Sequence, residues 1–139
     1  MYLLYTNTLK LAIEGDENVL QRVHKNLDNI WLISVAAEEF LVVFMSGLNR
    51  SRSLRNSLSL PRAHEDFAQA LEDLRVFPTF VYSDEAQAIY QTFAPATLRI
   101  GPQDCRIAAQ AMAHEMTVVT RNLRDFQAIG ASCEDWSAA

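Results

Sequence analysis

Residues 100–126 read IGPQDCRIAAQAMAHEMTVVTRNLRDF, and this stretch decides the fold class. Gly101 and Pro102 interrupt the chain, and a helix is predicted to begin there because proline is favoured in a first helical turn. Its apolar face is predicted to bury Ile107, Ala108, Ala111 and Met112, and the small alanines would let the helix lie close to a sheet. A short apolar strand, Thr117–Thr120, follows. A helix that returns the chain to a buried strand is typical of an α/β protein with a parallel sheet.

The rest of the chain repeats this alternation. Strands are predicted at Tyr2–Tyr5, Ile30–Val35 and Thr79–Tyr82, and a further short strand near Ser132–Trp136 would bring the sheet from four strands to five. Helices are predicted over Thr8–Glu14, from a cap at Asp16 to Leu27, from Ala36 past Arg52, from Pro61 through Leu74, from Ser83 to about Pro95, and around Asp125 and Phe126. We therefore expect one α/β domain over residues 1–139, with a parallel sheet covered by helices on both faces.

Composition narrows the class of protein. Half of the 139 residues are hydrophobic and 21% are charged, as in an ordinary globular domain. No apolar run is long enough to span a bilayer, and the start of the chain lacks a basic leader, so we expect no membrane association. Cys105 and Cys133 have no paired spacing, which favours reduced thiols in a cytoplasmic protein. The histidines, His24, His64 and His114, stand alone, which argues against a zinc site.

The charge is negative overall but uneven. A formal net charge of −5 argues against a protein that coats nucleic acid by bulk charge. The negative net charge does not exclude an enzyme that contacts a polyanion only at its active site. Four arginines cluster in a short stretch, namely Arg50, Arg52, Arg55 and Arg62. They form either a solvated surface or a patch that steers phosphate toward a site nearby.

Polar side chains follow several predicted strands, and in a parallel sheet these strand ends meet at one edge. They come from four places: Tyr5, Thr6 and Asn7; Glu38 and Glu39; Asp104; and Thr120, Asn122 and Asp125. Singly, each acid could serve only a helix dipole or a cap. Together, clustered carboxylates repel one another unless a cation neutralises them, and oxygen ligands of this kind suit Mg²⁺ or Mn²⁺. The matching chemistry is hydrolysis of a phosphodiester.

The sequence resembles the PIN-domain ribonucleases, and among them the VapC-like toxins of bacterial toxin–antitoxin pairs. The resemblance covers nearly the whole chain. It rests on MYLLYTN at 1–7, ISVAAEEFL at 33–41 with NRSRS at 49–53, the stretch 100–126, and CEDW at 133–136. The resemblance implies a three-layer α/β/α fold with a central parallel sheet of four to five strands. It also implies an endoribonuclease that needs Mg²⁺ or Mn²⁺.

Residue roles follow from the resemblance by position. The metal-binding and catalytic acids would be Glu39, Asp104 and Asp125, together with the catalytic Asn122, while Thr6, Asn7, Thr120 and Glu38 would support them. Whether Glu38 or Glu39 is the ligand stays open. RNA contacts are expected at Arg50, Arg52, Arg55 and Arg121. The implied partners are a VapB-like antitoxin, an RNA substrate and a second copy of the chain in a homodimer, in the cytoplasm.

The first acid of the family pattern is missing. The family reads Asp-Thr-Asn after the first strand, whereas this chain reads Tyr5-Thr6-Asn7. A neutral phenol is a poor ligand for a hard cation, and its ring is larger than a carboxylate. We therefore expect weakened metal binding and a strongly impaired nuclease. The alternative is an inactive PIN domain that still binds an antitoxin or RNA. A phosphotransfer receiver is a poorer interpretation, because Asp104 begins a helix and does not end a strand.

Overall fold

The computed structural model describes residues 1–53 and 59–138. A parallel sheet of five strands forms its centre, in the order β3-β2-β1-β4-β5. The strands are β1 (Tyr2–Leu4), β2 (Ile30–Ile33), β3 (Thr79–Phe80), β4 (Thr117–Val119) and β5 (Cys133–Glu134). This confirms the predicted α/β/α class and the fifth, terminal strand.

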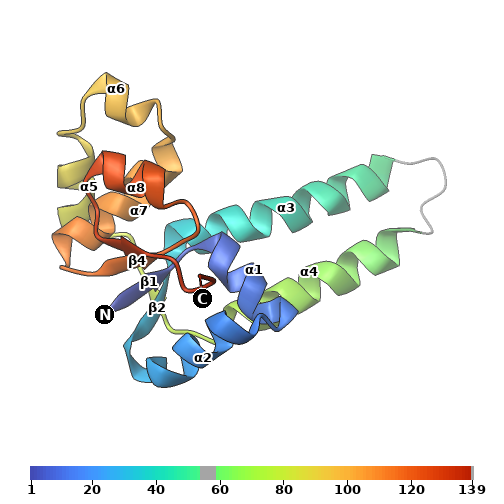
Figure 1. Cartoon of the computed structure of the whole chain (residues 1–139). Helices are drawn as coiled ribbons and strands as arrows, with labels where there is room; N and C mark the ends of the chain where they lie inside the picture. Colours follow the sequence, from blue (N-terminus) through green and yellow to red (C-terminus); the bar gives the residue numbers. More distant parts are fainter. Residues whose placement is uncertain (54–58, 139) are drawn as a thin grey trace.

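The helices cover both faces of the sheet. They are α1 (Thr6–Glu14), α2 (Glu17–Lys25), α3 (Ser34–Ser53), α4 (Leu60–Leu74), α5 (Asp84–Tyr90), α6 (Pro95–Leu98), α7 (Pro102–Ala113) and α8 (Leu123–Ile129), with a 3-10 turn at Leu27–Asn29. In Figure 1, α7 and α8 lie on the opposite side of the sheet from α1 and α2. No helix in the described part of the chain is long and apolar enough to cross a bilayer.

The order of the strands fixes where a site can form. From β1 the chain adds β2 and then β3 on one side, and it then crosses to place β4 and β5 on the other side. Tyr2 pairs with both Ile30 and Thr117, so all three strands start at the same level and end together. The direction of winding reverses beside β1, and ligands bind at the carboxyl ends of strands at such a point.

Burial of the strands drives this arrangement. Leu3 and Leu4 of β1 are fully buried, as are Val118 and Val119 of β4. Strands that are apolar on both faces need helices on both faces, which is why the chain alternates. Trp136, also fully buried, packs edge-on against Tyr2 at 5.0 Å between ring centroids. This contact holds the C-terminal segment against β1.

Several predicted boundaries are wrong. The first helix begins at Thr6 and not at Thr8, because Tyr5 is extended and already precedes the first helical turn. Val35 belongs to α3 and not to a strand. The helix expected to reach Pro95 ends at Tyr90, and Pro95 begins the separate helix α6. Proline is placed well in a first helical turn, which explains the second start.

The buried face of α7 also differs from the prediction at one position. Met112 is 40% exposed, whereas Gln110 is fully buried. The Gln110 amide donates to the carbonyl of Val81 at 3.1 Å, and its oxygen accepts from the backbone N–H of Ser83 at 3.0 Å. A buried amide is tolerated when it is hydrogen-bonded in this way, and here it ties α7 to the loop that follows β3.

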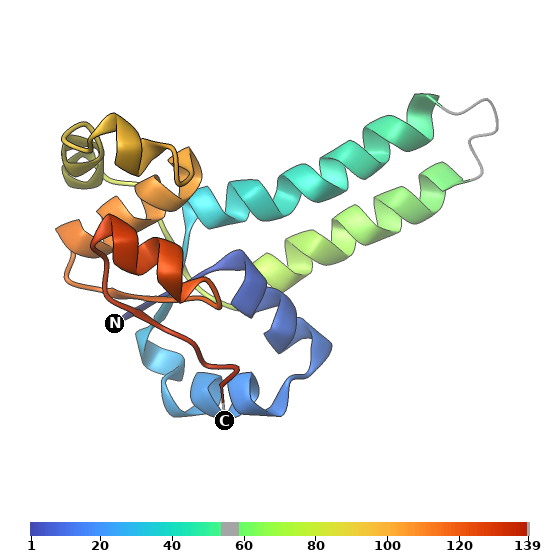
Figure 2. The same cartoon turned by 45° about the horizontal axis from the view of Figure 1, so that its top comes forward.

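Helices α3 and α4 pack along each other and project together from the sheet (Figures 1 and 2). Only the first turns of α3 lie next to the sheet edge, so this helix places Glu38 and Glu39 near the strand ends. The described residues at its far end lie away from the sheet.

Candidate active site

Tyr5 stands where β1 ends and α1 begins. Its backbone N–H donates to the carbonyl of Val119 at 3.0 Å, which holds it between β1 and β4. Its half-buried ring packs edge-on against Phe126 of α8, with 5.4 Å between the ring centroids. The phenol oxygen donates a hydrogen bond of 2.7 Å to Oδ1 of Asp104 at the start of α7. Tyr5 is therefore a fixed part of the sheet edge and points into the predicted site.

The charges of three acids act on the Tyr5 hydroxyl. Burial raises the pKa of Tyr5 above its ordinary value, and the hydrogen bond to Asp104 raises it further. The negative charges of Asp104, Glu39 and Asp125 act in the same direction. These acids come from α7, α3 and α8, and their charges all act on the phenol, but Asp104 is the one that hydrogen-bonds it.

Burial and mutual repulsion also perturb two of the acids. The pKa of Asp104 is raised first by burial and then by the charge of Asp125, while the bond from Tyr5 opposes the shift. The pKa of Glu39 is raised by burial, by Asp104 and by Glu38, and the hydroxyl of Thr6 at 3.5 Å opposes it. Within the described ranges, neither acid forms an ion pair with a cation. Their repulsion is therefore offset only by neutral hydrogen-bond donors, Tyr5 for Asp104 and Thr6 for Glu39.

A polar network supports the site from the β4 side. Asn7 donates to the hydroxyl of Thr120 at 3.5 Å, and its own oxygen accepts from the backbone N–H of Arg121 at 3.4 Å. The Thr120 hydroxyl accepts from the backbone of Asn122 at 3.0 Å, and the Asn122 amide donates to Asp125 at 2.9 Å. Predicted site residues from both ends of the chain thus form one chain of hydrogen bonds that orients Asp125.

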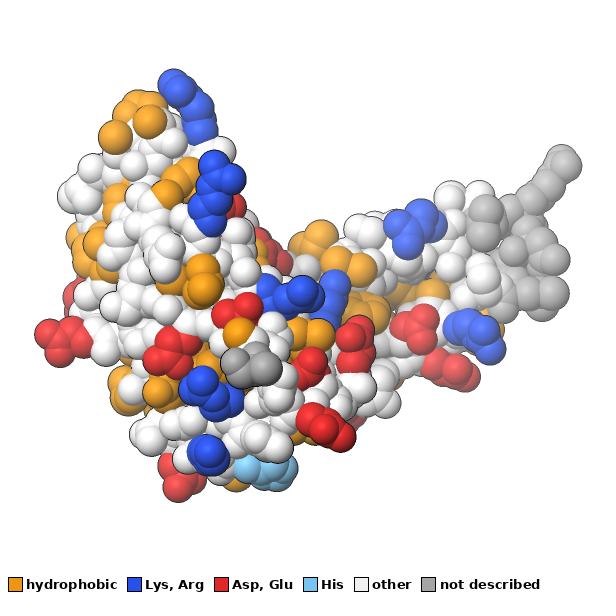
Figure 3. Space-filling model, viewed as in Figure 1, with side chains coloured by type: hydrophobic (Ala, Val, Ile, Leu, Met, Phe, Trp, Pro, Cys, Tyr) orange, Lys and Arg blue, Asp and Glu red, His pale blue; other side chains and the backbone are white. Residues whose placement is uncertain are grey.

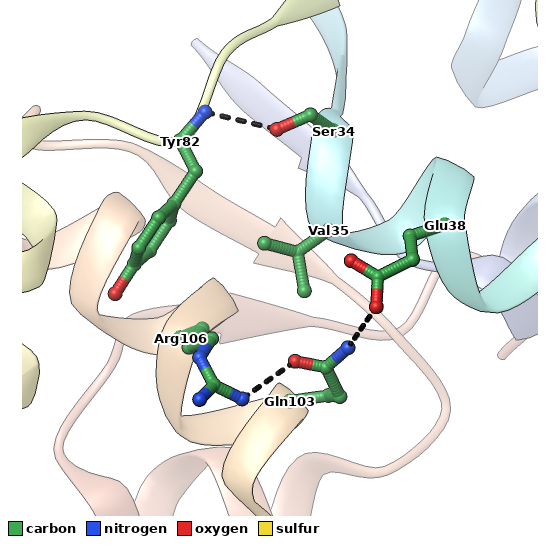
Figure 4. Close-up of a pocket in the computed structure, with 6 residues that line it drawn as sticks. All are labelled: Ser34, Val35, Glu38, Tyr82, Gln103 and Arg106. Carbon is green, nitrogen blue, oxygen red and sulfur yellow. Dashed lines mark hydrogen bonds between the residues drawn. The ribbon is translucent and has the colours of Figure 1, made fainter.

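Glu38 and Glu39 point to different places. Glu39 accepts a hydrogen bond from Thr6, and the charge of Asp104 raises its pKa. Glu38 is exposed and accepts a hydrogen bond of 3.0 Å from Gln103. Successive residues on a helix point about 100° apart, so only one of the pair can face Asp104. The geometry favours Glu39 for that position. Figure 4 shows Glu38 turned toward α7, where it lines a separate cleft.

The predicted arginines are not brought together. Arg50 and Arg52 are exposed near the far end of α3, and Arg121 is exposed directly after β4, beside Asn7. Arg55 lies outside the described residues. Figure 3 shows basic and acidic side chains interspersed on the visible face, without a continuous basic patch. Of the predicted arginines that the structure describes, Arg121 is the one that contacts a predicted site residue, through its backbone bond to Asn7.

The side chains present do not fit a divalent cation. Over residues 1–53 and 59–138, no group of three or more His, Cys, Asp or Glu side chains lies close enough to hold a metal ion. One oxygen of Asp104 is already bonded to the Tyr5 phenol, which is neutral and poorly suited to a hard ion. The Tyr5 phenol therefore occupies a hydrogen-bonding position on Asp104 that is not available to a cation.

Two residues near the site were missed from the sequence. Gln103 and Arg106 of α7 line a cleft of about 390 Å³ together with Ser34, Val35, Glu38 and Tyr82. Arg106 donates to the oxygen of Gln103 at 2.8 Å. Their spacing of three residues on a predicted helix, next to Asp104, was the signal that could have identified them.

Comparison with known proteins agrees with the fold. Residues 4–131 match the PIN domain family. No curated protein sequence matches the chain. Three solved structures are similar: DNA-bound VapBC from Salmonella typhimurium (25% identity, 97% of both chains, TM-score 0.73), VapBC2 from Rickettsia felis bound to a promoter DNA fragment (22%, 97% of this chain and 98% of the other, 0.72), and FitAcB from Neisseria gonorrhoeae (22%, 100% of both, 0.71).

Proposed function

The chain belongs to the PIN domain family, and from that premise we propose that it is a VapC-type toxin domain whose ribonuclease site is blocked by Tyr5. The similar structures include VapBC complexes, and another is described as a toxin–antitoxin complex from Klebsiella pneumoniae, which supports a protein of the toxin class. The proposed ancestral reaction is hydrolysis of RNA phosphodiester bonds, as the family resemblance implies. PIN domains generally depend on a divalent metal, so activity requires that the acidic residues can still bind one.

One observation carries this proposal. The Tyr5 hydroxyl lies 2.7 Å from Oδ1 of Asp104, and the charges of Glu39 and Asp125 also raise its pKa. An aspartate at this position would add a carboxylate among the three acids. Tyrosine instead adds a hydroxyl that donates a hydrogen bond to Asp104. Its aromatic ring, packed against Phe126, also fills space at the end of β1. Asp104 is therefore engaged by the protein itself, and hydrolysis is expected to be strongly impaired.

The test is cleavage of a panel of structured RNAs by the unaltered chain, Tyr5→Asp and Tyr5→Phe, each with Mg²⁺ and with Mn²⁺. We expect only Tyr5→Asp to cut and EDTA to stop it. Tyr5→Phe is the matched control, because it removes the hydrogen bond to Asp104 without adding an acid. Cutting by the unaltered chain at the rate of Tyr5→Asp would overturn the proposal. Failure of all three would favour the alternative, a binding module without catalysis.

A second candidate function is binding of an antitoxin, and an exposed surface on α3 favours it. Phe40 is buried, and Leu41 and Phe44 pack against the core, but Val43 is 56% exposed. Val42 and Met45 beside it are each 52% exposed. Val43 also lines a cleft of about 210 Å³ with Phe44, Gly47, Arg50, Ala63 and Asp66, between α3 and α4. Apolar side chains exposed together commonly mark a protein interface.

The expected occupant of this surface is a VapB-like antitoxin, and a homodimer is the second proposed assembly. Binding of the VapB-like protein from the same genome would be measured by calorimetry for the unaltered chain and Val43→Asp. We expect Val43→Asp to weaken binding, whereas Val81→Asp, a change at another exposed valine (70%), should not. Light scattering on the chain alone reports the dimer. Equal binding by Val43→Asp would place the antitoxin elsewhere.

A further inference from the structure

A second polar cleft lies beside the acidic site, across the start of α3 and α7 (Figure 4). Ser34, Val35 and Glu38 come from α3, Tyr82 from the loop after β3, and Gln103 and Arg106 from α7. Its volume of about 390 Å³ suits a ligand of the size of one nucleotide base with part of its sugar. Glu38 is next to Glu39 in sequence, and Gln103 is next to Asp104, so the cleft adjoins the three acids.

Hydrogen bonds arrange the polar groups of the cleft in a line. Arg106 donates to the oxygen of Gln103 at 2.8 Å, and the Gln103 amide donates to Oε1 of Glu38 at 3.0 Å. The guanidinium therefore stands at one end and the carboxylate at the other, as Figure 4 shows. Within the described ranges neither charge forms an ion pair, so each retains hydrogen-bonding capacity for a ligand.

The walls of the cleft are held in place by other contacts. Arg106 lies over the ring of Tyr90, at 4.7 Å from its centroid. The Tyr82 hydroxyl donates to Gln87 at 2.9 Å, and the Tyr82 backbone N–H donates to Ser34 at 2.9 Å. The aromatic ring of Tyr82 and the buried Val35 give the cleft an apolar side. A site formed before binding loses less entropy when the ligand arrives.

The two opposite charges select the ligand. A phosphate would meet the exposed carboxylate of Glu38, and a basic side chain would meet Arg106. A neutral planar group fits both side chains if it has an acceptor at one end for Arg106 and donors at the other end for Glu38. The Watson–Crick edge of guanine has this order: O6 accepts, and N1–H and the 2-amino group donate side by side to a carboxylate. Adenine and cytosine offer a single amino donor on that edge, and uracil has its one donor between two acceptors.

We propose that this cleft binds a guanine base of RNA, with Glu38 accepting from N1–H and the 2-amino group, Arg106 donating to O6, and the Tyr82 ring against the base. Unpaired RNA bases are commonly recognised through this edge and by stacking on aromatic rings. The inference rests on the proposed function for its choice of RNA as ligand. It adds which base the protein prefers and where that base lies relative to the three acids.

The test uses the unaltered chain in EDTA, with GMP, IMP, AMP, CMP and UMP as probes in ligand-observed NMR titrations. We expect GMP to bind best. IMP lacks only the 2-amino group and should bind roughly tenfold more weakly or worse, since a hydrogen bond to a charged group is lost. Glu38→Gln replaces an acceptor oxygen with a donor and should abolish the preference for GMP over IMP. Glu65→Gln, at an exposed position of α4, is the matched control and should keep it.

Equal binding of all five nucleotides, or an unchanged preference in Glu38→Gln, would overturn the inference. Competition by inorganic phosphate alone, at the same concentration as GMP, would also overturn it, because the cleft would then bind the phosphate and not the base. The outcome is separable from that of the proposed function, because no cleavage is needed. A GMP preference that depends on Glu38 can be found even if Tyr5→Asp never cuts RNA, and Tyr5→Asp can cut RNA while this cleft binds no base.

Discussion

The phenol of Tyr5 donates a 2.7 Å hydrogen bond to the carboxylate of Asp104, a residue 99 positions away in the sequence. This contact joins the end of β1 to the start of α7 at the point where the winding of the sheet reverses. Every expectation about activity depends on it. The same contact lowers the repulsion among the acids, because Asp104 is stabilised by a donor, and it fills the place around which those acids gather.

Removal of the hydroxyl should cost stability. Tyr5→Phe keeps the ring against Phe126 but leaves the partly buried Asp104 without its donor. We expect the free energy of unfolding at neutral pH to fall by about 1–3 kcal/mol. Urea denaturation would measure it. Tyr2→Phe is the control, because the structure shows no hydrogen bond from the Tyr2 hydroxyl to another described residue and the expected change is small. A loss no larger than that of Tyr2→Phe would mean that the Tyr5–Asp104 bond adds nothing to stability.

Metal should stabilise the Tyr5→Asp variant and not the unaltered chain. The variant adds a fourth carboxylate, so without metal it should melt at a lower temperature than the unaltered chain. Mn²⁺ that binds only the folded state would raise its melting temperature in proportion to the logarithm of metal concentration. The unaltered chain should show little shift. An equal rise in both proteins would show that Tyr5 does not impede binding.

The stability of the metal-free protein should depend on pH through Asp104 and Glu39. Their pKa values lie above the ordinary 3.8 and 4.5 in the folded protein. An acid whose pKa is raised by folding binds its proton more tightly in the folded protein. Its contribution to the free energy of unfolding is therefore fully present below the ordinary pKa, and it is lost as pH rises through the folded pKa. The double variant Glu39→Gln, Asp104→Asn should therefore gain stability relative to the unaltered chain as pH increases from about 4.

Denaturation curves in EDTA at several pH values would measure this difference. The pair Glu65→Gln, Asp66→Asn serves as the control, because both side chains are exposed on α4, and its difference from the unaltered chain should stay flat. A double variant at positions 39 and 104 whose advantage shrinks as pH rises would have the wrong sign for acids with raised pKa values.

Replacement of Gln110 should loosen the loop after β3. Gln110→Leu leaves the partly buried carbonyl of Val81 and N–H of Ser83 without their partner, and we expect the free energy of unfolding to fall by about 1–3 kcal/mol in total. Met112→Leu, on the exposed side of the same helix, should change stability by less than about 0.5 kcal/mol. Binding of GMP should weaken in Gln110→Leu, because the loop carries Tyr82. Equal stability of the two variants would contradict the role given to Gln110.

Much of the fold could be predicted from local patterns. Apolar runs marked the first four strands, and a fifth near Ser132–Trp136 was left as an option that the structure confirms. Asp16 caps α2 through the backbone N–H of Val19 as expected, and Pro61 lies in the first turn of α4. Such signals depend on neighbours in the chain, since periodic burial and capping are properties of a few consecutive residues. The boundaries at Thr6 and Val35 were less predictable, because a strand and the helix after it compete for the same residues. The end at Tyr90 was missed because Pro95 begins a separate helix.

The sequence by itself determined the α/β class. It also predicted that the acids lie at one edge of the sheet and that Tyr5 stands where the family resemblance implies an acid. Only the tertiary structure decided that the Tyr5 hydroxyl bonds Asp104, that Glu39 faces the acids while Glu38 faces Gln103, and that Gln110 is buried in place of Met112. These outcomes depend on how α3 and α7 are rotated against the sheet. That rotation is set by packing among residues far apart in the chain, which no local pattern records.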